Sequence, residues 1–406
     1  MSRRVPLWVA FVLVHAAVAW LGFALAGEPM GDVYRVYEPW SAQALQGGPI
    51  VGVTVDWVYP PLALVPMVLT QGLGWLVGSY TAGWAVLVAM ADAAAFALLV
   101  GDGRSRGRVT ASWFWLASIL ALGPAGLYRL DGLTVPLVIA GSLWLVRRPW
   151  LASIVLAAAT WIKVWPAAVL AAALVAVRRR GALVGGALAV SAAVLAVVAV
   201  LGGSSHAFGF VSGQATRGLQ LEAPVSMLYL WGTVAGVPGS WVYYSRELLT
   251  FQVTGANVDV VIAAMTPVLV VVVAAIWALG AVQVARGVRF AALFPTLSLA
   301  LVAAFIVLNK VGSPQYMCWL VPSVVVGLVV QRRRWGSPAL LAVAIAALTQ
   351  LVYPIRYAGV VAAEAGDVAL LTLRNALLVV LLGWMVVRLV RLPARQPVRP
   401  SRVPLL

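Results

Sequence analysis

Apolar segments long enough to cross a lipid bilayer recur along the whole chain of 406 residues. A transmembrane helix needs about 20 predominantly apolar residues to cross roughly 30 Å of hydrocarbon. Hydrophobic residues make up 63% of this sequence and charged residues only 10%, whereas about 25% of the residues of a soluble protein are charged. Because helices satisfy their own backbone hydrogen bonds in lipid, the sequence predicts an all-α polytopic membrane protein and excludes a soluble globular one.

The apolar segments predict about twelve transmembrane helices. The expected spans cover residues 5–26, 79–100, 110–128, 133–146, 150–163, 165–177, 181–201, 259–284, 290–309, 316–330, 338–355 and 368–389. Segments 58–76 and 225–250 are also apolar, but a single crossing by either would break the alternation of charge, so we expect outer-face juxtamembrane or re-entrant helices there. The first span exceeds the usual 7–15 apolar residues of a signal peptide, which favours an uncleaved anchor.

Arginine clusters predict the orientation of these spans. The clusters are Arg3 and Arg4; Arg104, Arg106 and Arg108; Arg147 and Arg148; Arg178 to Arg180; Arg286 and Arg289; Arg332 to Arg334; and Arg388, Arg391, Arg395, Arg399 and Arg402. Under the positive-inside rule they mark cytoplasmic loops and place both termini inside. All acidic residues except Asp92 and Asp102 fall in or beside the loops on the other side. The net charge of +16 is therefore a topology signal, and we expect contact with the lipid bilayer and no nucleic-acid binding.

The domain organisation follows from the same pattern. We expect one transmembrane domain over residues 1–392, with outer loops 27–58 and 202–258 on the active-site face, and a basic cytoplasmic tail over 393–406.

A lone cysteine, Cys318, excludes a disulfide within the chain, and two histidines give little support to zinc or haem sites. We therefore predict no cofactor, although Asp32, Glu38 and Asp56 share an outer loop and a divalent metal ion stays open.

Asp32 is the candidate catalytic base. It lies just after the first span, beside aromatic residues, where a carboxylate at the membrane boundary is suited to accept a proton. An alternative is that Asp32 caps a helix over residues 33–45, and the two roles are compatible. Asp56 lies before Tyr59-Pro60-Pro61, which fixes the entry of the next helix, and either caps that helix or recognises sugar hydroxyls.

Several cations lie in otherwise apolar surroundings and are candidates to bind a phosphate. They are Lys163, Lys310, Arg129 and Arg356. Ionisable groups at membrane depth usually face a cavity or a partner, so the alternatives are internal pairing, for instance of Arg129 with Asp131, or snorkelling. Lys163 lies at the apex of a short hairpin that Pro166 interrupts, far in sequence from any carboxylate, which favours a functional role.

The loop at residues 213–226 combines amides, a guanidinium and a carboxylate. Gln220 and Glu222 are suited to hydrogen-bond a polyhydroxylated ligand, while the planar fork of Arg217 is suited to a phosphate. The alternative is a solvated loop in which Arg217 pairs with Glu222, since such surface pairs are common and weak.

Six short segments resemble glycosyltransferase family 87, the actinobacterial polyprenol-phosphate-mannose-dependent alpha-1,2-mannosyltransferases of the membrane-embedded C-type superfamily. They are Gly31-Asp32-Val33-Tyr34, Tyr59-Pro60-Pro61, Lys163-Val164-Trp165-Pro166, Arg217 to Glu222, Ser313 to Pro322 and Thr349 to Pro354. The resemblance implies a C-type (GT-C) fold, an early outer-loop aspartate as catalytic base, here Asp32, and a donor with one sugar on a polyprenyl phosphate.

Together these observations predict a transferase of the bacterial plasma membrane with an extracytoplasmic active site. It would move one hexose, mannose by the family's habit, to a lipid-linked glycan or membrane glycolipid by inverting single displacement. The donor phosphate would meet Lys163, Arg217, Arg356 or Lys310. Sugar and acceptor contacts are assigned to Tyr34, Asp56, Tyr59, Asp131, Gln220, Glu222, Gln315 and Tyr316. The alternative function is a flippase or transporter of lipid-linked sugars, which would place polar groups through the membrane midplane.

Overall fold

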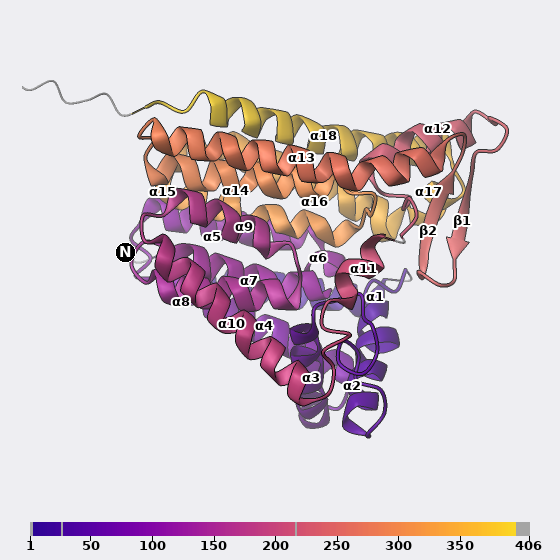
Figure 1. The fold of residues 1–406 in the computed structure, drawn as a ribbon, viewed down its shortest axis with the longest axis horizontal. Helices are drawn as coiled ribbons and strands as arrows, with labels where there is room; N and C mark the ends of the chain where they lie inside the picture. The colour runs from indigo at the N-terminus through magenta and orange to yellow at the C-terminus, as the bar shows by residue number, and fades with distance from the viewer. Residues whose placement is uncertain (1–2, 26, 216, 395–406) are drawn as a thin grey trace, which may run out of the picture.

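The computed structural model describes residues 3–25, 27–215 and 217–394. Within them the chain forms helices and one small hairpin (Figure 1). The helices of at least 14 residues are α1 (Arg4–Ala24), α3 (Leu64–Val77), α4 (Tyr80–Val100), α5 (Arg106–Leu122), α7 (Leu130–Trp144), α8 (Pro149–Ile162), α10 (Arg180–Val200), α13 (Val258–Ala285), α14 (Phe290–Val307), α16 (Gly336–Gln350) and α18 (Ala365–Val390). The shorter ones are α2 (Glu38–Leu45), α6 (Pro124–Leu127), α9 (Pro166–Ala176), α11 (Gly209–Ala215), α12 (Met227–Val234), α15 (Leu320–Gln331) and α17 (Tyr357–Val361).

Among the described residues, eight segments are long and apolar enough to cross a membrane. They are α1, α4, α10, α13, α14, Pro314–Arg334, Gly336–Ile355 and α18. The other expected spans contain α5, α7, α8 and α9, which have only 11 to 17 residues. The multi-pass, all-α membrane fold is thus confirmed, whereas the number of twelve crossings stays a prediction.

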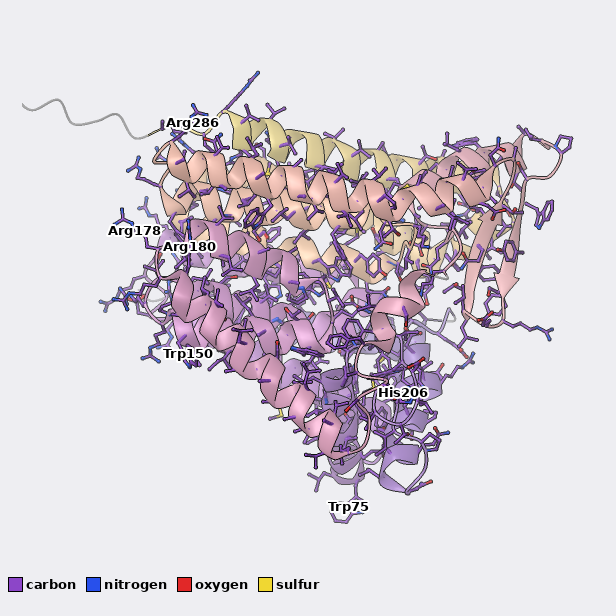
Figure 2. All side chains as sticks on the ribbon, in the orientation of Figure 1. Trp75, Trp150, Arg178, Arg180, His206 and Arg286 are labelled. Carbon is purple, nitrogen blue, oxygen red and sulfur yellow. The ribbon has the colours of Figure 1, made fainter. Side chains whose placement is uncertain are left out.

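The two ends of the helical bundle differ in charge. The N-terminus and the end of α18 lie at the same end of the molecule (Figure 1), and Figure 2 shows Arg178, Arg180 and Arg286 there as well. We call it the basic end. The opposite end, which we call the hairpin end, carries strands β1 (Trp241–Ser245) and β2 (Thr250–Thr254) together with α12 and α17. The tail after residue 394 lies outside the described residues.

The hairpin corrects the expectation that residues 225–250 form a helix. The helical part ends with α12, after a 3-10 turn at Pro224–Ser226, because Gly236 and Gly239 adopt positive φ angles of 67° and 83° on either side of Pro238. The aromatic and β-branched residues that follow favour a strand, and β1 pairs antiparallel with β2 in the register Tyr243 opposite Gln252. The helix expected in 58–76 is present as α3, which packs back on α4 where Gly74 meets Gly83.

Short helices at the centre of the bundle end partway along it. The Lys163 apex joins α8 to α9, as the sequence predicted, and the two helices have 14 and 11 residues. At 1.5 Å per residue they rise only about 21 and 16 Å from the basic end, whereas the 28 residues of α13 span about 42 Å. The apex therefore lies between the two ends of the bundle, and we call the region between it and the hairpin end the recess.

Candidate active site

Lys163, at the apex between α8 and α9, is held by a carboxylate. Its Nζ lies 3.2 Å from Oδ2 of Asp131, and the two side chains are 14% and 1% exposed. The other carboxylate oxygen, Oδ1, accepts a 2.8 Å hydrogen bond from Nε1 of Trp319. Nζ also lies 4.3 Å from the centre of the Tyr59 ring, within the range of a cation–π interaction. Lys163, which is remote in sequence from any carboxylate, thus has a partner 32 positions before it.

Asp32 faces a second cation. Its Oδ2 lies 3.3 Å from Nε of Arg129, although this contact lacks the alignment of a hydrogen bond. The guanidinium of Arg129 also donates to Oε1 of Gln315 at 2.9 Å and to the hydroxyl of Tyr353 at 3.2 Å. Asp32 occupies the position before the π-helical turn Val33–Tyr37, but its side chain makes no capping hydrogen bond. The carboxylate is therefore directed to Arg129, and the alternative pairing of Arg129 with Asp131 is not found.

Both ion pairs start from one tripeptide at the beginning of α7. Arg129 reaches outward to Asp32, while Asp131, two positions later, reaches Lys163. Asp131 lies in the first turn of α7, where the helix dipole favours a negative charge. The backbone N–H between them, that of Leu130, donates to the Tyr37 hydroxyl at 3.1 Å. This bond fixes the first outer loop, and with it Asp32, against α7.

Aromatic rings and polar groups complete the site. Tyr316 stacks on Trp319 with ring centres 4.1 Å apart, and Trp319 in turn stacks on Trp165 at 5.7 Å. The structure thus brings together Asp32, Tyr59, Asp131, Lys163, Gln315 and Tyr316, all of them predicted site residues, around Arg129.

Arg217 lies beside this cluster without a carboxylate partner. It is close enough to Tyr316 to interact electrostatically, and its buried Nε has no hydrogen-bond partner. No ion pair of Arg217 is found within the described part of the chain, and the alternative pairing with Glu222 is not formed because Glu222 pairs with Arg374. Among the cations near the site, Arg217 is therefore the one available to meet an incoming anion.

Gln220 and Glu222 belong to a buried junction behind Arg217. The Gln220 N–H donates to the carbonyl of Lys310 at 3.0 Å, and residue 220 also bridges to Gln252 of β2. Glu222 Oε2 lies 3.1 Å from Nη2 of Arg374 in α18, and the side chains are 4% and 1% exposed. Burial raises the pKa of Glu222 even though the arginine beside it opposes this shift. These contacts anchor the loop that carries Arg217.

The remaining predicted residues lie away from the Arg129 cluster. Asp56 pairs with His206 at 2.7 Å in an exposed contact, and Arg356 pairs with Asp367 at 2.8 Å. Tyr34 lies near Glu28, and burial together with a hydrogen bond to Glu28 raises its pKa. Burial lowers the pKa of Lys310, in the loop before Pro314. Their roles as ligands stay predictions.

The donor set for a metal ion is sparse. Within the ranges that the structure describes, no three His, Cys, Asp or Glu side chains converge on one point. Of the three carboxylates in the first outer loop, Asp32 faces Arg129 and Asp56 faces His206. These two carboxylates thus have different partners in separate places.

Some residues of the site escaped the sequence analysis. Trp319 and Tyr353 are bonded to Asp131 and Arg129, and Tyr37 accepts the N–H of Leu130 between them. Tyrosine and tryptophan are common at membrane interfaces and gave no separate signal. Arg374 is different, because a cation inside the apolar segment 368–389 is by itself a sign of a buried partner.

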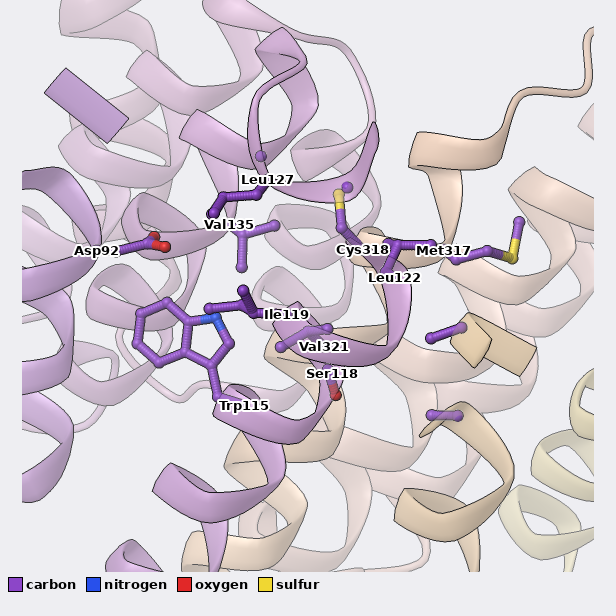
Figure 3. A pocket seen from close by; sticks show the side chains of 14 residues that line it. Asp92, Trp115, Ser118, Ile119, Leu122, Leu127, Val135, Met317, Cys318 and Val321 are labelled. Carbon is purple, nitrogen blue, oxygen red and sulfur yellow. The ribbon is translucent and has the colours of Figure 1, made fainter. Parts of the chain in front are cut away.

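A small cavity near Asp92 bears on the transporter alternative. Asp92 is buried and pairs with His15 at 3.1 Å. Figure 3 shows Asp92, Trp115 and Cys318 around the cavity, which measures about 30 Å³. A cavity needs roughly 10–15 Å³ of such volume to hold one water molecule, so the space beside Asp92 has room for about two water molecules and is too small for a sugar. Asp92 thus has the environment of a structural carboxylate.

Comparison with known proteins identifies the family. A family model described as Glycosyltransferase family 87 matches residues 57–308. No curated protein and no solved structure matches the chain. The matched range includes Tyr59, Asp131, Lys163 and Arg217, while Asp32 precedes it. Since the match covers more than half of the sequence, it confirms the family that the six segments indicated, and the chain belongs to glycosyltransferase family 87 as a multi-pass membrane glycosyltransferase.

Proposed function

We propose that this protein transfers one hexose, mannose by the habit of its family, from a polyprenyl-phosphate donor to a lipid-linked glycan. The observation that carries the proposal is the pairing of Asp32 with Arg129. The Asp32 side chain is 35% exposed, and only Oδ2 faces the arginine. Arg129 thus orients the carboxylate while Oδ1, which has no other partner in the described part of the chain, can accept a proton from an acceptor hydroxyl.

The cations at the recess suit a departing phosphate. Fixed positive charge in a site with little water stabilises negative charge as it develops on a leaving group. Arg217 lacks a carboxylate partner, and its fork can bind two phosphate oxygens at once. Lys163 is partly balanced by Asp131 and adds a second positive charge close to Tyr316. We assign the donor phosphate to Arg217 and Lys163.

The reaction is a single displacement. The acceptor oxygen bonds to the anomeric carbon, the bond from that carbon to the phosphate oxygen breaks, and the hydroxyl proton moves to Asp32. The phosphate leaves with the bonding electrons as a polyprenyl phosphate. Attack opposite to the leaving group inverts the anomeric carbon, so a β-linked donor gives an α-linked product. The arrangement supports this course because Asp32 and Lys163 approach from the two ends of the Arg129–Asp131 tripeptide.

The recess lies on the hairpin side of the apex, and the charge distribution supports an assignment of the two ends to the two sides of the membrane. Arg178, Arg180 and Arg286 lie at the basic end, near both ends of the described chain (Figure 2). By the positive-inside rule we assign the basic end to the cytoplasm and the recess to the extracytoplasmic face of the bacterial plasma membrane. Residues 1–392 would then form one transferase domain, followed by a cytoplasmic tail.

Replacing Asp32 by Asn tests the proposal. With polyprenyl-phosphate mannose and a membrane glycolipid fraction, we expect D32N to lower the transfer rate by about 10²- to 10⁴-fold, as removal of a general base does. The matched control is E247Q, which neutralises an exposed carboxylate near the hairpin tip. Near-normal transfer by folded D32N would refute Asp32 as the base. Transfer that requires a sugar nucleotide instead would refute the donor class.

A further inference from the structure

The ends of α13 and α18 are joined at the basic end of the bundle. Gln283, in the last turn of α13, is buried, and its Nε2 donates to the carbonyl oxygens of Leu389 and Val390 at 2.9 and 3.1 Å. Arg286 follows the last residue of α13 and donates to Oε1 of the same glutamine at 3.2 Å. A buried amide thus holds the guanidinium group of Arg286 beside the end of α18.

A second arginine is fixed at the same helix end by an aromatic ring. Arg388 lies in the last turn of α18, with its Cζ 4.6 Å from the centre of the Trp335 ring, and its Nη1 donates to the carbonyl oxygen of Arg334 at 2.9 Å. Trp335 is fully buried and packs against Gly327 of α15, where a Cβ atom would lie 2.1 Å from the indole. The indole is therefore held in place, and the guanidinium of Arg388 is held with it.

Four arginines lie where α13 and α18 end. They are Arg286, Arg334, Arg388 and Arg391, the last of which follows the end of α18, and we call them the arginine quartet. All but Arg388 are exposed. The charges of Arg388 and Arg334 are close enough to repel one another. The quartet thus concentrates positive charge at one place on the surface of the basic end.

The chain supplies no carboxylate to the quartet. None of the four arginines forms an ion pair with another described residue. From residue 260 onward the sequence has only two acidic residues, Glu364 and Asp367, and both lie near the start of α18, roughly 30 Å along the helix from the quartet. Asp102, in the loop after α4, accepts a bond from the N–H of Arg104. The positive charge of the quartet is therefore available to an anion from outside the chain.

Exposed apolar residues lie on the same two helices just before the quartet. Val282 of α13 and Val387 and Val390 of α18 are each about half exposed. A free phosphate needs only the charges, whereas a phospholipid also needs an apolar surface along which its acyl chains can lie. Basic groups beside apolar helix faces are typical of sites for anionic lipid headgroups. The surroundings of the quartet therefore favour a lipid over a soluble anion.

We propose that the arginine quartet binds the headgroup of an anionic phospholipid, with the acyl chains along the exposed faces of α13 and α18. The planar fork of a guanidinium binds two phosphate oxygens at once. Cations near the end of a helix also interact favourably with its dipole, but Arg286 and Arg388 each use one nitrogen in the contacts described and keep most of their N–H donors for a ligand. The quartet shares no residue with the proposed transfer site.

Native mass spectrometry of the full chain in detergent tests the site. The probes are phosphatidylglycerol, which is anionic, and phosphatidylcholine, which is zwitterionic. The wild type should retain phosphatidylglycerol much more tightly than phosphatidylcholine. We expect R286Q/R388Q to bind phosphatidylglycerol about 10- to 30-fold more weakly than the wild type, because it removes the two arginines that the fold holds in place.

The variant R147Q/R148Q provides the matched control. It removes the same charge from the basic end, and both arginines are exposed. Figure 2 shows Trp150, next to them in sequence, far from Arg286. This variant should bind phosphatidylglycerol as the wild type does. Equal losses in the two double variants would indicate a general effect of charge and overturn the site. Unchanged binding in R286Q/R388Q, or equally tight binding of phosphatidylcholine, would overturn it as well.

A second variant separates binding from folding. R286Q/R391Q changes two exposed arginines and leaves the contact of Arg388 with Trp335 intact, so its Tm without added lipid should equal that of the wild type. Its binding of phosphatidylglycerol should still weaken about fivefold or more. Normal binding by this variant, with a lowered Tm of R286Q/R388Q, would make Arg388 structural and overturn the quartet. Displacement of bound phosphatidylglycerol by inorganic phosphate would overturn the lipid as its ligand. D32N should bind phosphatidylglycerol normally, so the two proposals can fail separately.

Discussion

The molecule contains two arginine–carboxylate pairs that differ in their surroundings. In the recess, the side chains of Arg129 and Asp32 are 14% and 35% exposed and 3.3 Å apart. In the junction behind it, those of Arg374 and Glu222 are 1% and 4% exposed and 3.1 Å apart. The charges of a buried pair cannot separate without leaving one of them uncompensated in a medium of low dielectric. In a partly exposed pair, one residue can leave its partner and bind a substrate instead.

This difference in burial indicates that the pair of Glu222 with Arg374 is structural. Glu222 ties the Arg217 loop to α18, and its backbone carbonyl accepts additional bonds from Arg374 and Asn375. Gly312 packs directly against the backbone of Glu222 and Ala223, where a larger side chain would clash. The junction is therefore fixed, so that the recess in front of it can hold a reactive carboxylate in place. Each prediction below tests this division.

The largest effect is expected from Glu222→Gln. The substitution leaves the charge of Arg374 buried without a partner, which costs about 3–5 kcal/mol in such pairs. Thermal unfolding in detergent should show a strongly lowered Tm, whereas D32N should unfold near the wild-type temperature. A double variant, E222L with R374M, removes both charges and should recover most of the loss. Equal Tm values for E222Q and D32N would abolish the distinction between the two pairs.

Arg374→Met should be less harmful than E222Q, and its effect should depend on pH. Glutamate can neutralise itself by binding a proton, whereas arginine stays charged. Burial already raises the pKa of Glu222, so the folded state holds the proton more tightly than the unfolded state. In R374M the folded state should therefore be most stable below the usual pKa of glutamate, and lose stability as the pH rises through the raised pKa. A Tm of R374M that is independent of pH would contradict this.

Asp131→Asn probes the second pair of the recess. Asn can still accept the Trp319 hydrogen bond, but Lys163 loses its countercharge in a nearly buried position. We expect a loss of about 2 kcal/mol in the free energy of unfolding, together with slower transfer. A K163M/D131N double variant should regain stability but not activity. Recovery of both stability and activity would show that Lys163 does not bind the donor.

The arrangement of the bundle could be predicted because it depends on local patterns. Apolar segments and arginine clusters located the helices, and Pro166 after Lys163 located the apex between α8 and α9. The hairpin was missed because residues 225–250 are apolar enough for a helix. Gly236 and Gly239 were the signal against a helix, and their positive φ angles now explain the break.

The pairing of charged residues could not be predicted. Asp32 meets Arg129, and Glu222 meets Arg374, across separations of 97 and 152 positions. Residue types alone show which ions need partners but not which loops the fold brings together. The alternative pairing of Arg129 with Asp131 does not form, for a local reason. Near the start of a helix, residues two positions apart face different directions, so the two side chains diverge to Asp32 and Lys163.

Arg217→Ala should weaken donor binding without affecting the fold. Arg217 has no carboxylate partner, so its removal leaves no carboxylate without a countercharge. We therefore expect Tm to stay near that of the wild type. Loss of one charge-assisted contact with phosphate should weaken binding of a short-chain polyprenyl phosphate about tenfold. R217K should recover only part of the affinity, because it lacks the planar fork. A large drop in Tm with unchanged affinity would make Arg217 part of the fixed junction.

The smallest effect is expected at an exposed pair, Asp56 with His206. The carboxylate side chain is 70% exposed, so water screens the pair, and the coupling in a double-mutant cycle should be below about 1 kcal/mol. If Asp56 also binds sugar hydroxyls, as the sequence predicts, H206A should change KM for the acceptor while Tm stays constant. A coupling near that of Glu222 and Arg374 would show that exposure does not separate the fixed pairs from the open ones. In that case the exposure of its ion pair would no longer identify the recess as the reactive part of the molecule.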